Sequence, residues 1–256
     1  SGWWPRMMRA ALAQMRCEKG AIKQNLATIA HYLAEAAGQD CDLLALPEMC
    51  LTGYADPNRY PQAVLRLDGP EVAQLLEMTR PYATTILAGL IEHNPHGKPF
   101  ITHIVACGGA LLGCYRKITI KDDEVAWFAP GTDVPVFPLG EHTFGIAICA
   151  DIDNPAVFAR CREGGADIVF EVAAPGLYGE QATRNWESGY RWWEEKCRAQ
   201  LGAYARDNGL WIAVATQAGR TMDEDFPGGG YLFARSGERV NATKNHLPGV
   251  LYVTID

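Results

Sequence analysis

Short apolar runs of strand length alternate along the chain with longer segments in which apolar residues recur every three or four positions. The first cycle predicts a strand over residues 9–15, an amphipathic helix over 20–38 and a buried strand over 41–46. The same pattern predicts helices over 69–76, 155–163 and 186–207, and strands over 84–91, 100–107, 110–116, 143–149, 166–172, 210–216, 231–234 and 250–255. Strands that alternate with helices in this way indicate an α/β layer structure.

The chain has 256 residues and shows no internal repeat, low-complexity tract or linker. A chain of this size can bury one deep core, so we expect a single domain over residues 1–256. Within it, we expect residues 1–8 to be a tag remnant and a flexible N-terminus.

The charge balance excludes several classes of partner. The chain carries 23 Lys and Arg against 30 Asp and Glu, a net charge of -7, so it has no surplus of positive charge with which to bind nucleic acid. No apolar run reaches the ~20 residues that cross a bilayer, so we expect no membrane partner. The eight cysteines are scattered through apolar stretches, which is typical of reduced thiols and predicts a cytoplasmic protein.

Three predicted strands lead into a reactive side chain: the first into Glu48, the second into Lys117 and the third into Cys149. Ligands of open α/β folds bind beyond the carboxyl ends of strands, so we expect these side chains to meet in one pocket. There the carboxylate can take the proton of the thiol, and the ammonium can stabilise the oxyanion that forms when the thiolate attacks a carbonyl carbon. The three side chains therefore predict acyl-transfer chemistry at a cysteine, through a thioester. A cysteine at a strand end is more often a buried small hydrophobe, and Cys50 is a rival thiol near Glu48.

Sequence blocks around these residues resemble the three signatures of the nitrilase superfamily of carbon-nitrogen hydrolases. The blocks are LPEMCLTGY (46–54), YRKI (115–118) and GIAICAD (145–151), and EVAWFAPG (124–131) resembles the block that carries a supporting glutamate. The resemblance extends from residue 9 to residue 256, and several blocks together are more specific than any one of them. It implies a four-layer α-β-β-α sandwich, commonly paired as a homodimer or higher homo-oligomer.

The resemblance also implies a role for individual residues. Glu48 is expected to be the general base, Lys117 the stabiliser of the tetrahedral intermediate and Cys149 the nucleophile. Glu124 is expected to hold the lysine or the substrate, and the backbone N–H of Ala150 to donate to the oxyanion. No cofactor and no metal are expected.

Substrate-binding residues are expected at Tyr54, Asp153 and Trp192. Trp192 lies off an aromatic stripe that includes Trp193 and has helical period, typical of core or of a subunit interface. Asp153 stands where amidase-like relatives often carry a cation, which favours a neutral or amine-bearing amide; equally, it is a suitable residue just before the helix that begins at Pro155. After Val172, the side chains of Glu171, Tyr178 and Glu180 either reach the pocket or face solvent.

The expected reaction is hydrolysis of a small non-peptide carboxamide with release of ammonia. Ala150 and Asp151 follow the cysteine, whereas nitrile-cleaving members usually carry Trp-Glu there, so a nitrilase is less favoured. The alternatives left open are an N-carbamoyl amidohydrolase, an acyl transferase and a catalytically idle binding protein of the same fold.

Overall fold

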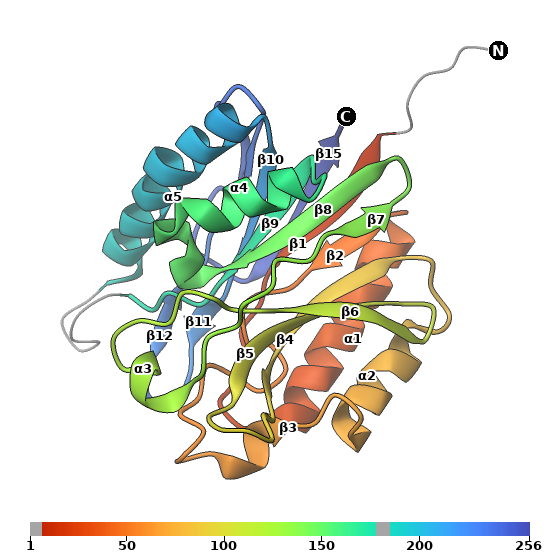
Figure 1. Cartoon of the computed structure of the whole chain (residues 1–256), viewed down its shortest axis with the longest axis vertical. Helices are drawn as coiled ribbons and strands as arrows, with labels where there is room; N and C mark the ends of the chain where they lie inside the picture. The colour runs from red at the N-terminus through yellow and green to blue at the C-terminus, as the bar shows by residue number, and fades with distance from the viewer. Residues whose placement is uncertain (1–6, 178–184) are drawn as a thin grey trace.

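The computed structural model describes residues 7–177 and 185–256, which form two stacked β-sheets between two layers of helices (Figure 1). The order of the strands in the first sheet is β15-β1-β2-β4-β5-β6, with β3 on β4. Its strands are β1 (Met8–Gln14), β2 (Leu43–Ala45), β3 (Val64–Leu65), β4 (Thr85–Glu92), β5 (Phe100–Cys107), β6 (Ala110–Arg116) and β15 (Gly249–Ile255). The strands β1, β2 and β4 run parallel to one another at its centre.

The second sheet has the order β14-β13-β10-β9-β8-β7, and β8, β9 and β10 form its parallel centre. Its strands are β7 (Phe137–Leu139), β8 (His142–Ile148), β9 (Ile168–Ala173), β10 (Trp211–Thr216), β13 (Tyr231–Phe233) and β14 (Arg239–Ala242). A separate antiparallel pair joins β11 (Ala218–Arg220) to β12 (Asp225–Pro227). The carboxyl ends of the two parallel centres supply the residues described below.

Helices cover the outer face of each sheet. Figure 1 shows α1 (Ile22–Gly38) and α2 (Pro70–Thr79) on the first sheet, and α4 (Pro155–Glu163) and α5 (Trp186–Asn208) on the second. The remaining short pieces are α3 (Glu124–Trp127) and the 3₁₀ helices η1 (Pro61–Ala63) and η2 (Cys149–Asp153). This is the predicted four-layer α-β-β-α sandwich.

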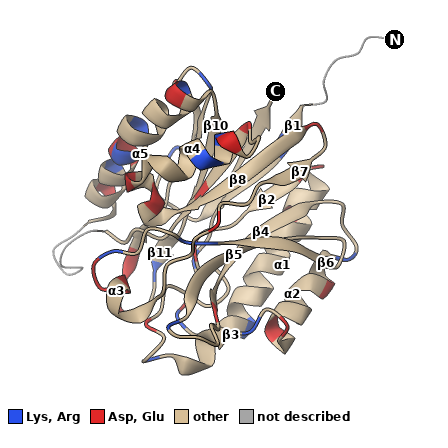
Figure 2. Cartoon of the chain, in the orientation of Figure 1, with Lys and Arg blue, Asp and Glu red and all other residues tan. Residues whose placement is uncertain are grey.

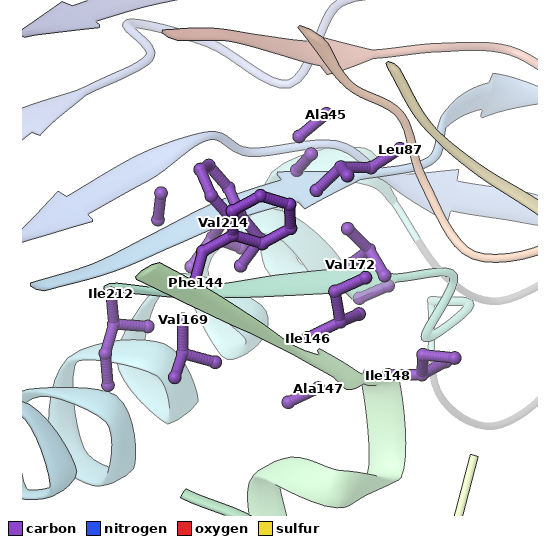
Figure 3. Packing of buried hydrophobic residues seen from close by; sticks show 14 of the residues in the cluster. Ala45, Leu87, Phe144, Ile146, Ala147, Ile148, Val169, Val172, Ile212 and Val214 are labelled. Atoms are coloured by element: carbon purple, nitrogen blue, oxygen red, sulfur yellow. The ribbon is translucent and has the colours of Figure 1, made fainter. Parts of the chain in front are cut away.

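Alternation along β1 shows why the two sheets stack. Ala10 and Leu12 join the core that the two sheets share, whereas Ala11 and Ala13 pack in a second core beneath α1 and α2. Both faces of the strand are therefore buried, which explains its nearly continuous apolar sequence. Phe144 of the second sheet lies in the shared core together with Ala45 and Leu87 of the first sheet (Figure 3). It contacts Phe137 and Phe170 of its own sheet at ring-centre distances of 5.5 and 5.6 Å.

The predicted long elements are confirmed to within a few residues, and α4 has the predicted bounds. One boundary was wrong at the site: β8 ends at Ile148, and Cys149 already belongs to η2. The short strands β3, β7, β11 and β12 and helix α3 were not predicted, because two to four residues carry no periodic signal. Among the described residues, the structure has no helix that is long and apolar enough to span a membrane.

Candidate active site

Glu48 is placed by the chain as it leaves β2. The following residue, Met49, has φ of 52°, and the loop lies so close to β4 that a Cβ added to Gly89 would be 2.3 Å from the Met49 nitrogen. The Leu51 N–H donates to the Gly89 carbonyl at 2.9 Å. Glu48 is fully buried, and its Oε1 accepts a hydrogen bond from the N–H of Ala174 at 3.2 Å. The loop therefore fixes a buried carboxylate beneath the pocket, beside the lining residue Lys117.

Lys117 follows β6 and crosses toward the same point. Its backbone N–H donates to the Ile101 carbonyl, and its carbonyl accepts from the Gly131 N–H, both at 2.8 Å. Its buried Nζ lies 2.9 Å from Glu48 Oε2 and 2.9 Å from Glu124 Oε1. An ammonium has three N–H donors, so two are used by the glutamates and a third is available to a substrate oxygen.

Glu124 is the first residue of α3 and holds the lysine from the other side. Its Oε2 also accepts a hydrogen bond from the hydroxyl of Tyr54. Tyr54 thus reaches the catalytic groups through Glu124 as well as lining the pocket. We expect this pairing to keep Lys117 charged and aimed at the space above Cys149.

Cys149 begins η2 directly after β8, and its φ of 42° is unusual for a residue with a side chain. The turn is held by Asp151, whose buried carboxylate accepts hydrogen bonds from the Ile148 N–H at 2.9 Å and the Thr119 N–H at 3.0 Å. The hydroxyl of Tyr115 also donates to Asp151. Strain at one residue persists only where its surroundings fix it, and these bonds tie the turn to Tyr115 in β6 and to Thr119, on either side of Lys117. Sequence reasoning used Asp151 only to choose a family branch and missed this role.

The two reactive acids of the site have shifted pKa values. Burial raises the pKa of Glu48 to about 7, although Lys117 opposes this effect. Burial and the neighbouring Glu48 raise the pKa of the Cys149 thiol above its usual value, with Lys117 again opposing. The resting thiol is therefore protonated, and Glu48, within hydrogen-bonding reach of it, has the pKa expected of a base that works near neutral pH.

Burial by itself would lower the pKa of Lys117, but Glu48 and Glu124 outweigh it, and the net effect is a raised pKa. Lys117 therefore remains an ammonium over the working pH range. Together, Glu48, Lys117, Glu124 and Cys149 form what we call the floor of the pocket.

A cavity of about 580 Å³ opens above the floor. All the predicted substrate-binding residues, Tyr54, Asp153 and Trp192, line it, and so does Ala150 beside the nucleophile. Trp193 is buried in the core, as its helical stripe predicted, and it also lines the cavity. Its indole N–H donates to Thr216 Oγ1 at 2.9 Å. Lining residues that the sequence gave no reason to choose are Lys19, Asp56, Arg59, Tyr60, Lys121, Asp122, Asp123, Trp127, Ile152, Ala174, Pro175, Lys196, Asp223 and Glu224.

Asp153 does not present a free carboxylate to the pocket. Its Oδ2 lies 2.8 Å from Lys121 Nζ, and its Oδ1 lies 2.7 Å from Lys196 Nζ and 2.9 Å from Gln200 Nε2. We call Lys121, Asp153 and Lys196 the lysine cluster. The prediction of a neutral or amine-bearing substrate assumed an unpaired acidic group, and this pairing removes that premise. Lys121 lies in the loop before α3 and Lys196 lies in α5. Both are distant from Asp153 in the sequence, so the pairing could not be predicted from the residues next to it.

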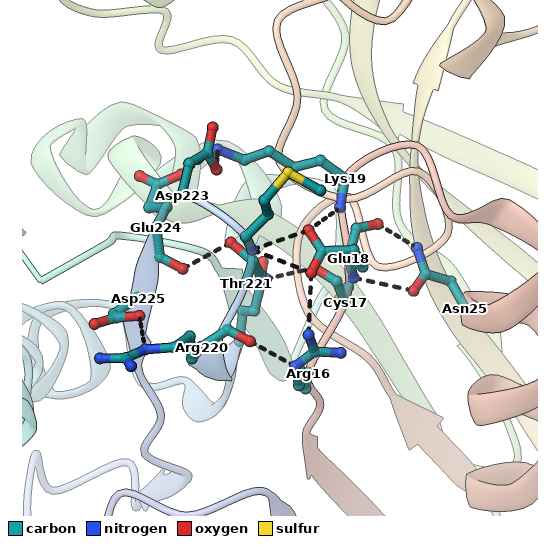
Figure 4. Close-up of polar contacts among 12 residues, drawn as sticks. Arg16, Cys17, Glu18, Lys19, Asn25, Arg220, Thr221, Asp223, Glu224 and Asp225 are labelled. Atoms are coloured by element: carbon teal, nitrogen blue, oxygen red, sulfur yellow. Dashed lines mark hydrogen bonds and ion pairs between the residues drawn. The ribbon is translucent and has the colours of Figure 1, made fainter.

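A second charged group lies elsewhere on the pocket rim, where Lys19 Nζ is 2.8 Å from Asp223 and 2.9 Å from Glu224. We call these three residues the acidic cluster. Figure 4 shows that they join the segment after β1 to the connection between β11 and β12. In Figure 2 the strands are largely free of charge, and the charged residues lie mainly on helices and loops.

Of the three residues suggested around the loop after β9, only Glu171 lies in the described structure; Tyr178 and Glu180 lie outside the described residues. Glu171 is buried within β9 and is not among the described residues that line the pocket. Burial raises its pKa, with Asp151 adding to the effect. It therefore neither faces solvent nor contacts the cavity. The residues described also include no group of three or more His, Cys, Asp or Glu side chains placed to hold a metal ion.

Comparison with known proteins gives a family match over nearly the whole chain. The family model described as carbon-nitrogen hydrolase matches residues 9–256. A glutamine-dependent NAD(+) synthetase of Thermotoga maritima is 27% identical over 97% of this chain, which spans only 42% of the length of that relative. A probable nitrilase of Schizosaccharomyces pombe is 25% identical over 96% of this chain and 88% of the relative.

Solved structures show the same fold. A variant of an amidase from Nesterenkonia sp. AN1 matches with a TM-score of 0.82 and 25% identity, over 98% of this chain and 93% of the amidase. A glutamine-dependent NAD+ synthetase of Acinetobacter baumannii matches with a TM-score of 0.83 and 21% identity, over 98% of this chain and 46% of the synthetase. The four-layer architecture is therefore shared both with a stand-alone amidase and with part of a larger synthetase.

Proposed function

This chain belongs to the carbon-nitrogen hydrolase family, and from this premise we propose that it is an amidase that hydrolyses a small non-peptide carboxamide and releases ammonia. The observation that carries the proposal is the position of Lys117 Nζ, 2.9 Å from both Glu48 and Glu124, at the bottom of the pocket into which Cys149 opens. A base, a cation and a nucleophile then face one substrate carbonyl. The amidase of known fold described above supports the same reaction class.

The first half-reaction forms an acyl-enzyme. Glu48 takes the proton of the Cys149 thiol as the sulfur attacks the carbonyl carbon, and the carbonyl oxygen becomes an oxyanion. Lys117 Nζ and the backbone N–H of Ala150 stabilise that oxyanion. The protonated Glu48 then gives its proton to the departing nitrogen, the C–N bond breaks, and ammonia leaves a thioester on Cys149.

Water completes the cycle. Glu48 takes a proton from a water molecule, the oxygen attacks the thioester carbon, and a second oxyanion forms at the same place. Its collapse breaks the C–S bond and returns the proton to the sulfur, which releases the carboxylic acid. The nucleophile, the base and the stabilising cation in this route are all side chains of the protein.

A second candidate is the use of glutamine as the amide, with the ammonia passed to another enzyme. It is favoured by the similarity to glutamine-dependent NAD(+) synthetases, of which this chain spans less than half. Glutamine is itself a carboxamide, so the same residues would act on it. A glutamine preference over other primary amides would select this candidate.

The test is ammonia release from a panel of aliphatic carboxamides, monoamides of dicarboxylic acids, glutamine, N-carbamoyl amines and nitriles. We expect release from an amide, and a fall of about 10⁴-fold or more in Cys149→Ala, because the catalytic groups act as one unit. Cys114→Ala is the matched control, since that half-buried cysteine on β6 is not a pocket residue, and it should retain full activity.

The nature of the products separates the alternatives. Release of carbon dioxide together with ammonia would indicate an N-carbamoyl amidohydrolase, and preferential capture of the acyl group by added hydroxylamine would indicate an acyl transferase. Ammonia release from a carboxamide that persists in Cys149→Ala would contradict the proposed mechanism.

A further inference from the structure

The segment that leaves β6 has side chains that alternate between two different surroundings. Its odd-numbered residues contact the floor of the pocket, or η2 and the residue after it; they are Tyr115, Lys117, Thr119 and Lys121. Between them, Arg116 pairs with Glu92 at 2.6 Å. Ile118 and Ile120 line a separate cavity of about 660 Å³. A period of two is that of an extended chain, so Lys117 has neighbours on both sides that reach toward the turn of the nucleophile.

Asp151 is the point at which this segment is bound to that turn. Its Oδ2 accepts a hydrogen bond from the Tyr115 hydroxyl, and its Oδ1 accepts one from the Thr119 N–H at 3.0 Å. Asp151 and Tyr115 are both buried. Burial and the neighbouring Asp151 raise the pKa of the Tyr115 hydroxyl, so it stays protonated and remains a donor. Hydrogen bonds to an ionised acceptor are about twice as strong as neutral ones, so this contact is a firm one.

Two further contacts join the same segment to the end of the turn. Thr119 Oγ1 accepts a hydrogen bond from Asn154 Nδ2 at 3.1 Å. Lys121 Nζ lies 2.8 Å from Asp153, but these side chains are 45% and 28% exposed, so solvent weakens their interaction. The connection is therefore strongest at Asp151 and becomes weaker toward the rim of the pocket.

These contacts matter because the two oxyanion donors come from different sheets. Lys117 follows β6 of the first sheet, whereas Ala150 follows β8 of the second. The oxyanion has to receive one hydrogen bond from Lys117 Nζ and one from the Ala150 N–H, so a shift of one sheet along the other would separate its donors. Asp151 is the residue next to Ala150, and its two partners, Tyr115 and Thr119, are each two residues from Lys117.

We propose that Tyr115 and Thr119 are positioning residues: by binding Asp151 on either side of Lys117, they hold its ammonium and the Ala150 N–H where both can donate to one oxyanion. Neither is among the described residues that line the cavity, so they act through the groups that they hold. This inference rests on the proposed amidase function, to which it adds the residues that align the oxyanion donors.

The first test is Tyr115→Phe, which removes the hydroxyl and keeps the buried ring. We expect kcat per active site to fall about 10- to 100-fold for the best amide, because a displacement of about 1 Å can cost about 10²-fold in rate. KM should change less than about threefold, since the lost interaction is made in the transition state. Active sites are counted by stoichiometric alkylation of Cys149 with iodoacetamide.

Thr119→Val is a milder variant of the same connection. It removes the acceptor for Asn154 but keeps the backbone N–H that binds Asp151. Its kcat should fall about two- to tenfold, the value of one ordinary hydrogen bond. If Tyr115→Phe fails to fold, as judged by circular dichroism, Thr119→Val carries the test, since Thr119 is only half-buried.

A second readout requires no turnover. Lys117 lowers the pKa of the Cys149 thiol, against the effects of burial and of Glu48. If the loss of the Tyr115 hydroxyl lets the lysine move away, that pKa rises, and the curve of alkylation rate against pH should shift to higher pH. Because the chain has eight cysteines, alkylation of Cys149 is followed by mass spectrometry of its peptide.

Tyr190→Phe is the matched control. Its hydroxyl donates to the Thr243 carbonyl at 3.1 Å, and it is not among the described residues that line the cavity. We expect it to leave both kcat and the alkylation curve unchanged. If Tyr115→Phe lowers the unfolding temperature but keeps a normal kcat per active site, or leaves the alkylation curve in place, its role is structural and the inference is overturned.

The two readouts separate the failure of this inference from the failure of the proposed function. If the unsubstituted enzyme hydrolyses no amide, yet the alkylation curve shifts in Tyr115→Phe and not in Tyr190→Phe, the positioning role stands and the amidase function fails. If amides are hydrolysed, but neither kcat nor the curve responds to Tyr115→Phe, the function stands and the positioning role fails.

Discussion

The floor and the rim of the pocket are both built from charged side chains, but they differ in burial and in pairing. On the floor, Lys117, Glu48 and Glu124 have at most 8% of their side chains exposed. On the rim, Lys19, Asp223, Lys121 and Asp153 have 13–45% exposed. Buried charges interact strongly, and removal of one partner is strongly destabilising because the other is left buried and unpaired. Exposed pairs contribute little to stability. The floor is therefore suited to chemistry and the rim to the choice of substrate.

The largest effect is expected from changing a floor residue without changing its shape. Glu48→Gln keeps an acceptor for the Ala174 N–H but cannot take the thiol proton. We expect kcat for the best amide to fall about 10²–10⁴-fold, as for the loss of a general base, with KM little changed. Steady-state kinetics of ammonia release measures this. Gln200→Asn, on the rim side of η2, is a control that should stay within a few-fold of the unsubstituted enzyme. A variant with near-normal kcat would show that another group is the base.

A smaller but graded effect is expected from pH. Glu48 has a pKa raised to about 7 and is active as the carboxylate, so kcat/KM should fall by about tenfold per pH unit below 7. Stability should respond with the opposite sign. A carboxyl whose pKa is higher in the folded than in the unfolded protein contributes stability below the unfolded value of about 4.5 and loses it as the pH rises through 7.

The pH–rate profile and the unfolding midpoints of the unsubstituted protein and Glu48→Gln, taken from pH 4.5 to 8, measure both effects. As the pH rises, the unfolding midpoint of the unsubstituted protein should fall relative to that of Glu48→Gln. A difference that is independent of pH would show that Glu48 does not titrate in this range.

The smallest effect is expected on the rim. Lys19→Gln removes the cation that pairs with Asp223 and Glu224, and the free energy of unfolding should fall by less than about 1 kcal/mol, because Asp223 is 42% exposed and solvent weakens the interaction. Urea denaturation measures the change, and kcat for a neutral amide should stay within about twofold. If Lys19→Gln lowered kcat as much as Glu48→Gln does, the assignment of chemistry to the floor and of substrate choice to the rim would be wrong.

Most of the layer structure could be predicted, because it depends on local patterns. The residues Ile22, Leu26, Ile29 and Leu33 repeat with the helical period, and three of them are buried in α1. The elements that were missed are short and are defined by their neighbours: β3, for example, is two residues paired with Ile91 and Glu92 of β4. The end of β8 at Ile148 was missed for a related reason, since the turn at Cys149 depends on bonds from Asp151 to Thr119 and Tyr115.

The candidate site divides in the same way. Glu48, Lys117 and Cys149 could be chosen from the sequence, because each stands in a characteristic block at or just after the end of an apolar run, and Glu124 could be chosen from the resemblance of its block alone. Their pKa values could not, because the shifts come from burial and from one another. The lining residues Lys19, Lys121 and Lys196 stand in no such block.

Periodicity and functional-group chemistry belong to the chain, so the sequence was enough to predict the longer strands and helices and the side chains that can act as base, cation and nucleophile. How those groups are charged and paired depends on the fold. Asp153 shows the difference: in sequence it is an isolated acid, but the fold brings to it Lys121, 32 residues before it, and Lys196, 43 residues after it. The sign of an electrostatic site is the sum over all charges within a few ångströms, and that sum is fixed by contacts between segments that are distant in the chain.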